Sequence, residues 1–189
     1  ISAGYVFTVD MDLEKFFDTV SHSKLIEILS RTIKDGRVIS LIHKYLNSGI
    51  LIGGKKESSP VGVSQGGPLS PLLSNIMLNE LDKELEKCGH LFVRYADDLV
   101  IFCKSRRSAQ CTLDNLLPFI ETKLFLKVNK EKPYVAYMRD IKFLSYAFGC
   151  CNGEWQVIPP YKRLCRMSVC FELVTLLLRC TTILCLKVN

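Results

Sequence analysis

The sequence feature that most constrains the fold is a pair of apolar runs joined by four residues that include two carboxylates. The runs are Leu91–Arg94 and Leu99–Cys103, and Tyr95-Ala96-Asp97-Asp98 stands between them. Short apolar runs with a turn-like link predict a β-hairpin. Because both runs are apolar, the acidic tip is expected at the mouth of a core rather than on a polar loop. The alternative is that two adjacent aspartates merely favour a turn.

A further carboxylate follows an earlier apolar run. Tyr5–Val9 predicts a short buried strand that ends in Asp10 and Asp12. If this strand neighbours the hairpin in one sheet, Asp12, Asp97 and Asp98 converge at one sheet end. Two such charges about 4 Å apart repel by roughly 4 kcal/mol at an effective dielectric constant of about 20, so the cluster needs a cation. Carboxylate oxygens favour Mg²⁺ or Mn²⁺, and two such ions activate an attacking hydroxyl and stabilise a leaving pyrophosphate.

Helical periodicity and capping residues predict three helices around these strands. Lys24–Ile33 has an amphipathic pattern, and Asp35 is a candidate cap of the next helix. The third is predicted over 105–127, with a bend at Pro118.

A fourth helix follows a glycine-rich loop. Ser70 is the expected cap, Pro71 suits the first helical position, and the helix is expected to end near Lys87. Its residues expected to face inward are Leu72, Leu73, Ile76, Leu81 and Leu85.

Short β-rich runs follow later in the chain. They cover 134–137, 143–148 and 155–158, and Asn152-Gly153 predicts a hairpin turn between the last two. Strands and helices are mixed without a regular βαβ alternation. We therefore expect an α+β fold in which helices back an antiparallel sheet.

Charge and composition limit the class of protein. The chain has 189 residues and a net charge of +6, and 48% of its residues are hydrophobic, which excludes a disordered chain. Residues 1–100 hold 11 basic and 13 acidic side chains, whereas residues 101–189 hold 14 basic and 6 acidic ones. A basic half indicates a polyanionic partner, although two differently solvated surfaces explain the split equally well.

Cysteine usage and hydropathy predict a cytosolic-type compartment, in a bacterial cytoplasm or, as the alternative, in an organelle. None of the nine cysteines has metal-ligand spacing, so reduced thiols are expected. The first residues do not resemble a signal peptide, and charged residues interrupt the apolar run Val169–Val188. No membrane partner is therefore expected.

Two further segments are candidate parts of a binding site. The loop Gly62–Pro71 contains glycines that let a backbone approach a ligand, with Gln65 as donor and acceptor. Its alternative is an ordinary loop before a helix. Phe16 and Phe17 closely follow Asp12, and core packing is expected for one of them. The other aromatic ring, beside a bound sugar, would exclude a 2′-hydroxyl by contact.

Three motifs, in this order, resemble the palm motifs of reverse transcriptases. They are the segments Asp12–Asp18, Gln65–Pro71 and Tyr95–Asp98. Their flanks resemble the group II intron-encoded reverse transcriptases, or maturases, in particular. The flanking segments are Ser70–Ile76 running into Asn79–Asp82, and Asp35–Arg37 leading into Leu46–Gly49. The resemblance covers about residues 5–160.

This resemblance implies a right-hand polymerase palm with part of the fingers, and RNA-directed DNA synthesis. Asp12 and Asp97 match the principal metal ligands, and Asp98 completes the acidic triad that catalyses nucleotidyl transfer. The implied cofactor is a pair of Mg²⁺ ions, with Mn²⁺ as a substitute. The residues that match nucleotide-binding positions are Phe17, Gln65, Gly66 and Lys132, and those that match the primer-grip hairpin are Phe143, Leu144, Ser145 and Tyr146.

The chain departs from the family pattern at two places within these motifs. The family usually has glycine where Ser145 stands, and often proline where Ser64 stands. Residues 1–160 are expected to form the palm with partial fingers, with further fingers motifs before Ile1. Residues 161–189 do not resemble the thumb helices of the family, and the 189 residues alone are expected to be inactive.

The implied partners are an RNA template, a DNA or RNA primer, deoxynucleoside triphosphates and intron RNA. One alternative is an RNA-binding maturase that assists intron splicing through basic surfaces. Another is the reverse transcriptase of a retron or of a diversity-generating element, which the Ser70–Asn75 segment disfavours.

Overall fold

The structure, a computed structural model, describes residues 4–52, 55–57, 61–129, 135–151 and 154–158. The chain divides into two compact units, residues 1–141 and residues 142–189. The first unit contains, in order, β1 (Phe7–Met11), α1 (Phe16–Thr19), α2 (His22–Thr32), α3 (Gly36–Leu46), β2 (Ile50–Ile52), β3 (Lys55–Glu57), α4 (Ser70–Lys87), β4 (Leu91–Tyr95), β5 (Asp98–Cys103), α5 (Arg106–Lys123), β6 (Val135–Tyr137) and a 3₁₀ turn, Met138–Asp140.

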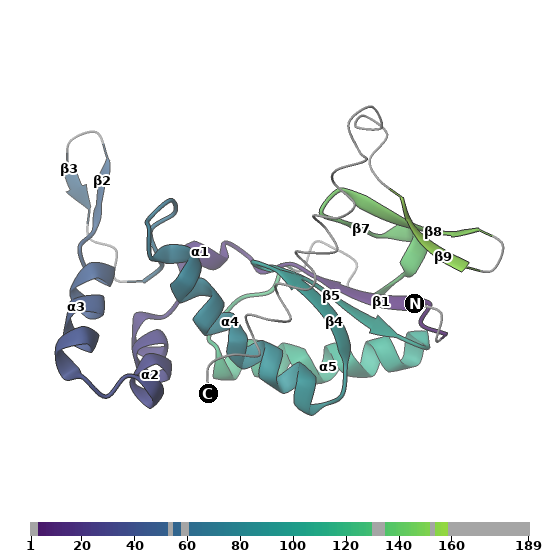
Figure 1. Cartoon of the computed structure of the whole chain (residues 1–189), viewed down its shortest axis with the longest axis horizontal. Coiled ribbons are helices and arrows are strands. Elements are labelled where there is room, and N and C mark those ends of the chain that lie inside the picture. The colour runs from purple at the N-terminus through teal and green to yellow at the C-terminus, as the bar shows by residue number, and fades with distance from the viewer. Residues whose placement is uncertain (1–3, 53–54, 58–60, 130–134, 152–153, 159–189) are drawn as a thin grey trace. The chain divides into compact units, whose positions relative to one another are not determined.

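The centre of the first unit is a four-stranded antiparallel sheet with the order β4-β5-β1-β6 (Figure 1). The predicted hairpin is confirmed as β4 and β5, and its partner β1 lies beside β5. The first strand runs two residues further than the predicted Tyr5–Val9, because pairing with β5 continues to Met11. Asp10 therefore lies inside the strand, opposite Val100.

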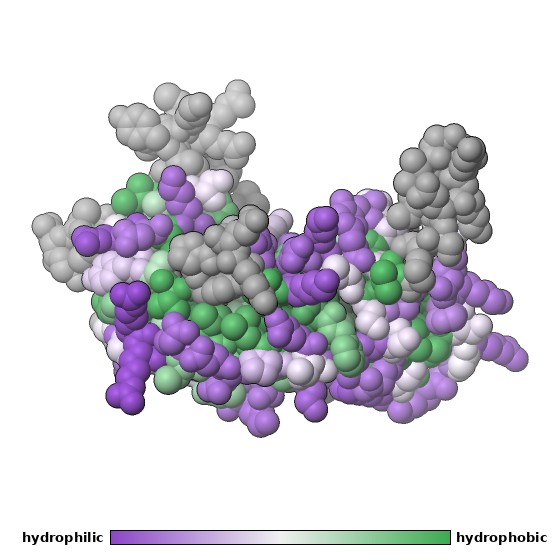
Figure 2. All heavy atoms as spheres, turned by 180° about the vertical axis from the view of Figure 1, so that it is seen from behind, coloured by the Kyte–Doolittle hydropathy of each residue, from purple (hydrophilic) through white to green (hydrophobic). Residues whose placement is uncertain are grey.

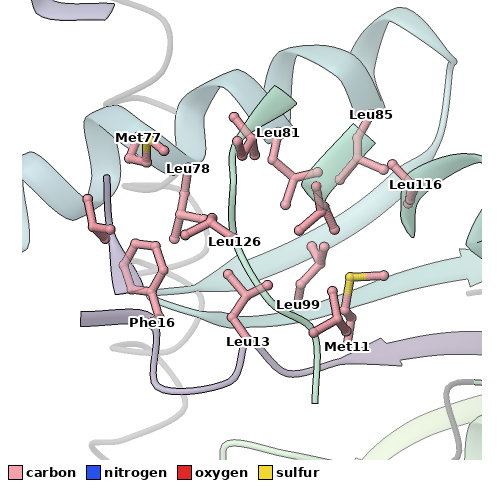
Figure 3. Close-up of a cluster of buried hydrophobic side chains, with 14 of the residues drawn as sticks. Met11, Leu13, Phe16, Met77, Leu78, Leu81, Leu85, Leu99, Leu116 and Leu126 are labelled. Carbon is pink, nitrogen blue, oxygen red and sulfur yellow. The ribbon is translucent and has the colours of Figure 1, made fainter. Parts of the chain in front are cut away.

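Helices α4 and α5 pack on one face of this sheet (Figure 1). Alternate residues of the strands face the helices, including Met11 on β1 and Leu99 on β5, which are directly paired. Figure 3 shows these two side chains together with Leu81 and Leu85 of α4 and Leu116 of α5 in one apolar cluster. Burial of alternating strand residues against helical stripes confirms the predicted α+β class.

The buried face of α4 differs in phase from the prediction. Leu73, Leu81 and Leu85 are buried as expected, but Leu72 is 56% exposed. The buried stripe recurs every four residues from Leu73, so it includes Met77, and Leu72 lies outside it. Leu78 and Met77 are fully buried as well (Figure 3).

Side-chain caps mark the starts of α2, α3 and α5. The Ser21 Oγ accepts a hydrogen bond from the Lys24 backbone N–H at the start of α2. The predicted Asp35 cap of α3 is confirmed, since its carboxylate accepts from the Arg37 N–H at 2.8 Å. At α5, Ser105 accepts from the Ser108 N–H, and Pro118 lies within the helix without ending it.

The second unit contains a three-stranded antiparallel sheet, β7 (Lys142–Phe143), β8 (Tyr146–Cys151) and β9 (Glu154–Ile158). The single strand predicted over 143–148 is wrong, because a two-residue turn at Leu144 and Ser145 divides it. Asn152-Gly153 and residues 159–189 lie outside the described residues.

One face of the molecule carries both hydrophilic and hydrophobic side chains. Hydrophilic side chains cover much of the face in Figure 2, with hydrophobic side chains between them. Cys88 and Cys111 are exposed free thiols and Cys103 is a buried one, and burial raises the pKa of the Cys103 thiol. Among the described helices, none is both long and apolar enough to cross a membrane.

The turn between β7 and β8 generates a prediction about stability. Leu144 and Ser145 both have left-handed backbones, with φ of 50° and 70°. This conformation costs a residue with a side chain roughly 1–2 kcal/mol, which glycine avoids. Ser145→Gly is therefore expected to stabilise the hairpin by about 1 kcal/mol. Hydrogen exchange at the Phe143 and Tyr146 amides measures it.

The matched control is Ser108→Gly in α5, where the backbone is helical and glycine is expected to destabilise by roughly 0.5–1 kcal/mol. Faster exchange at Tyr146 in Ser145→Gly would contradict the prediction.

Candidate active site

Register places two of the three predicted carboxylates at adjacent strand ends, Asp12 directly after β1 and Asp98 as the first residue of β5. Met11 is the last residue of β1 and pairs with Leu99 of β5. The next position outward on β1 is Asp12, and on β5 it is Asp98, so the two stand across from each other at one sheet end. Because Met11 and Leu99 face the helices, Asp12 and Asp98 lie on the opposite face of the sheet.

The third carboxylate, Asp97, lies in the hairpin turn. Tyr95 pairs with Asp98, so the turn contains only Ala96 and Asp97 and is narrower than the predicted four-residue tip. Ala96 has a left-handed backbone with φ of 53°. Asp97 is half-buried and Asp98 is exposed. The backbone thus brings Asp12, Asp97 and Asp98 to the same end of the sheet.

A short segment after α5 holds the backbone at Asp12. The Asn129 N–H donates to the Asp12 carbonyl at 3.0 Å, and the Glu14 N–H donates to the Lys127 carbonyl at 2.9 Å. Leu13 forms an isolated antiparallel bridge with Val128 between these two bonds. The Asn129 side-chain amide also reaches the Asp12 carboxylate, at 3.5 Å. The chain leaving β1 is therefore fixed on the side away from the hairpin.

The donor set at this sheet end fits a hard divalent cation, because it consists of carboxylate oxygens. The side chains do not converge in the same way as the backbone. Across the described part of the chain, no three His, Cys, Asp or Glu side chains form a group that could hold a metal ion. Like charges repel, so the backbone arrangement by itself does not draw the carboxylates together.

Of the two aromatic residues after Asp12, one is buried in the core and the other is partly accessible, as the sequence suggests. Phe16 is 2% exposed and packs in the core, where Figure 3 shows it near Leu13. Phe17 is half-buried and contacts Phe16 edge-on, with ring centroids 5.4 Å apart. Phe17 is therefore the member of the pair whose ring is partly accessible.

The loop before α4 is attached to the segment that carries Phe17. The Val63 N–H donates to the Phe17 carbonyl at 2.6 Å, and the Gly62 N–H donates to the Val20 carbonyl at 2.8 Å. Buried His22 adds a third bond, from its Nε2 to the Gly62 carbonyl. These contacts bring the loop that contains Gln65 beside the helix that contains Phe17.

The start of α4 corrects one predicted cap. Ser70 is the first residue of the helix rather than its cap, and its hydroxyl donates to the Ser64 carbonyl. The Gly67 N–H donates to the same carbonyl at 3.2 Å. Gln65 and Gly66 lie at the exposed tip of this turn.

A buried ion pair near the hairpin was not foreseen from the sequence. Asp82 of α4 is 5% exposed, and its carboxylate accepts two hydrogen bonds from Arg94 of β4. The signal was present, since Asp82 falls on the buried stripe of α4 between Leu78 and Leu85. A carboxylate there needs a cation, and Arg94 interrupts an otherwise apolar strand.

Two groups of predicted residues cannot be placed beside this site. Lys132 lies outside the described residues. Phe143, Leu144, Ser145 and Tyr146 form the β7–β8 hairpin of the second unit, with Phe143 paired to Tyr146.

Residues 2–148 match the sequence profile of the family described as "Reverse transcriptase (RNA-dependent DNA polymerase)". The chain belongs to this family. Enzymes of this family generally use divalent metal ions. The match covers the central sheet, both helices on its face and the three motifs, so the family is established for the part of the chain that contains the candidate site.

Named relatives agree with the resemblance to the group II intron-encoded class. The chain is 27% identical to the group II intron-encoded protein LtrA of Lactococcus lactis over 76% of its own length and 35% of LtrA. It is 29% identical to protein YkfC of Escherichia coli over 71% of its own length and 44% of YkfC. The chain thus spans less than half the length of these relatives.

The fold matches that of a solved telomerase. The apo telomerase of Candida tropicalis superposes with a TM-score of 0.63 at 14% identity, over 81% of this chain and 33% of the telomerase chain. A match at this low identity is evidence for the fold alone. The shared fold confirms the predicted polymerase palm.

Gly62 generates a prediction about the attachment of the loop. Its φ is 91°, and a Cβ there would lie 2.9 Å from the backbone oxygens of Phe17 and Asp18. Gly66 is also left-handed, with φ of 82°, but a Cβ there meets nothing within 4 Å. Gly66→Ala is expected to destabilise by about 1–2 kcal/mol through backbone strain alone, and Gly62→Ala by more. Denaturant unfolding measures both.

The comparison of these two variants isolates the close approach, since the backbone strain is shared. Equal loss of stability in Gly62→Ala and Gly66→Ala would contradict the inference that the close approach at Gly62 leaves no room for a Cβ.

Proposed function

We propose that this chain carries the polymerising site of a group II intron-type reverse transcriptase, which copies RNA into DNA. The observation that carries the proposal is the register of β1 and β5. It sets Asp12 across from Asp98 at the sheet end where the turn holds Asp97, in a chain of the reverse transcriptase family.

In the proposed reaction, the primer 3′-hydroxyl attacks the α-phosphorus of a deoxynucleoside triphosphate. A new phosphodiester bond forms, the bond to the β-phosphate breaks, and pyrophosphate leaves. Asp12, Asp97 and Asp98 are the proposed catalytic carboxylates. The substrates and partners are an RNA template, a DNA or RNA primer and deoxynucleotides.

The same three carboxylates would hold two Mg²⁺ ions, with Mn²⁺ as a substitute. Such ions lower the pKa of an attacking hydroxyl and offset charge on the leaving pyrophosphate. The donor chemistry supports this assignment, because hard cations prefer carboxylate oxygens. Asn129 and the Lys127–Asn129 backbone would keep Asp12 in place at the strand end.

Four residues would contact the incoming nucleotide. The partly accessible Phe17 ring would lie against the sugar, and Gln65 and Gly66 would approach from the attached loop. Lys132 would lie near the phosphates. In the second unit, Phe143, Leu144, Ser145 and Tyr146 would contact the primer strand.

A second candidate function is the binding of intron RNA as a splicing cofactor. The observation that favours it is the similarity to the group II intron-encoded protein LtrA. The 14 basic residues against 6 acidic ones in residues 101–189 fit binding to a polyanion, and such binding weakens steeply with salt. The two functions are compatible in one protein.

Asp97→Asn in the full-length protein tests the polymerase proposal. The change keeps the size of the side chain and removes its charge, so primer extension on an RNA template is expected to fall by about a hundredfold or more. Extension is measured with a labelled primer in Mg²⁺. The matched control is Asp114→Asn, an exposed carboxylate of α5, which is expected to leave extension unchanged.

Retained extension in Asp97→Asn would refute the polymerase proposal. Splicing of the intron RNA by the same variant separates the second function, since RNA binding does not need this carboxylate. Loss of splicing together with extension would contradict independent functions.

Phe17→Ala tests the nucleotide site. If the ring excludes a 2′-hydroxyl by contact, its removal is expected to raise ribonucleotide incorporation relative to deoxynucleotide incorporation by about ten- to a hundredfold. Single-nucleotide extension with each substrate measures the ratio. Phe17→Tyr keeps the ring and is the control, with discrimination retained. An unchanged ratio in Phe17→Ala would rule out this role.

A further inference from the structure

Arg94 makes a set of contacts that ends at the turn carrying Asp97. Its Nε donates to the Asp82 Oδ1 at 2.7 Å, and its Nη2 donates to the Asp82 Oδ2. Its Nη1 donates to the Ala96 carbonyl at 2.8 Å and to the Asn75 Oδ1 at 3.3 Å. One guanidinium thus joins two residues of α4 to the hairpin turn.

The fold directs Arg94 toward α4. Arg94 pairs with Leu99 across the hairpin, and Leu99 lies in the core on the helical face of the sheet. Cross-strand partners share a face, so the Arg94 side chain leaves the sheet on the side where α4 packs. Both partners are nearly buried, with side-chain exposures of 12% for Arg94 and 7% for Asp82. Water therefore competes little for the two bonds to Asp82, and this ion pair anchors the guanidinium that donates to the Ala96 carbonyl.

The contact with Ala96 fixes the position of the next residue. A peptide unit is planar, so the Ala96 carbonyl and the Cα of Asp97 lie in one rigid plane. Holding that carbonyl sets the orientation of the plane and hence the place of Asp97. The turn needs such support, because Ala96 adopts a left-handed backbone that is unfavourable for a residue with a Cβ.

We propose that Arg94, anchored by Asp82, is a positioning residue that holds the Ala96–Asp97 peptide and so places the Asp97 carboxylate for catalysis. This inference rests on the proposed polymerase function. It predicts that Arg94 changes the rate and the metal requirement of the reaction rather than the affinity for nucleic acid, because Arg94 contacts only α4 and the turn in the bonds described above.

The first test variant is Arg94→Lys in the full-length protein. Lysine keeps the charge beside Asp82, but one ammonium nitrogen does not reproduce the planar fork that reaches the carboxylate and the Ala96 carbonyl together. We expect kcat per active site to fall by about ten- to a hundredfold, as for a catalytic group misplaced by about an ångström. The Mg²⁺ concentration for half-maximal rate is expected to rise, with the Kd for template–primer unchanged.

The second variant is the double change Asp82→Leu with Arg94→Met, which removes the ion pair without leaving a buried charge. Replacing a buried pair by apolar residues is often neutral or stabilising, so the Tm is expected to stay close to that of the unmodified protein. The same loss of kcat is expected, because the bond to Ala96 is gone. A lower kcat at an unchanged Tm would show that Arg94 acts by positioning Asp97 and not by stabilising the fold.

The matched control is Arg31→Lys. Arg31 also donates to a carboxylate of α4, Glu80, at 2.7 Å, but it is half exposed and has no bond to the turn. Active-site titration normalises all rates to folded, competent protein. Arg31→Lys is expected to leave kcat and the Mg²⁺ requirement unchanged.

A readout independent of activity is hydrogen exchange in the peptide containing Asp97 and Asp98. Faster exchange there in Arg94→Lys, with α4 protection retained, supports the positioning role. The positioning role would be overturned if kcat per active site and the Mg²⁺ requirement were unchanged in both test variants, or if exchange at the turn were unchanged. Absence of extension by the unmodified protein would instead refute the polymerase proposal, and the exchange measurement would still decide whether Arg94 holds the turn.

Discussion

The antiparallel pairing of β1 with β5 is the constraint on which the candidate site depends. It joins Met11 to Leu99 and thereby sets Asp12 across from Asp98. Side chains alternate along a strand, so a slip of one residue would turn Asp12 toward the helices. Burial of Val9, Met11, Leu99 and Ile101 against α4 and α5 prevents that slip. The packing of apolar residues therefore decides where the carboxylates stand.

The sequence predicted those elements whose signals are local. The β4–β5 hairpin and the Asp35 cap have recognisable residues at fixed spacing, and both are present, although the hairpin turn is shorter than predicted. Periodicity merged β7 and β8 into one strand over 143–148, because Leu144 is apolar, whereas the family resemblance placed a hairpin at 143–146, which the pairing of Phe143 with Tyr146 confirms. The predicted buried face of α4 was wrong at Leu72, because a leucine-rich helix has several apolar stripes and only packing determines which of them is buried.

The Arg94–Asp82 pair shows a different limit of sequence analysis. Each residue is conspicuous alone, a charge among apolar neighbours, but their pairing requires that β4 and α4 share a face. Carboxylates at the sheet end repel one another, so their charges alone do not hold them together. The support comes from outside the cluster, from the Asn129 segment at Asp12 and from Arg94 at the turn.

Backbone groups rather than side chains make most of the attachments around the loop before α4, and this explains the departure from the family pattern at Ser64. The Gly67 N–H and the Ser70 hydroxyl both donate to the Ser64 carbonyl, which a proline at that position would present equally. The side chain at 64 is exposed and free to vary for the same reason. Gly62 is different, because its backbone lies against the carbonyls of Phe17 and Asp18 and leaves no room for a Cβ. The loop therefore tolerates a change of side chain at residue 64, whereas a side chain at residue 62 would meet the backbone of Phe17 and Asp18.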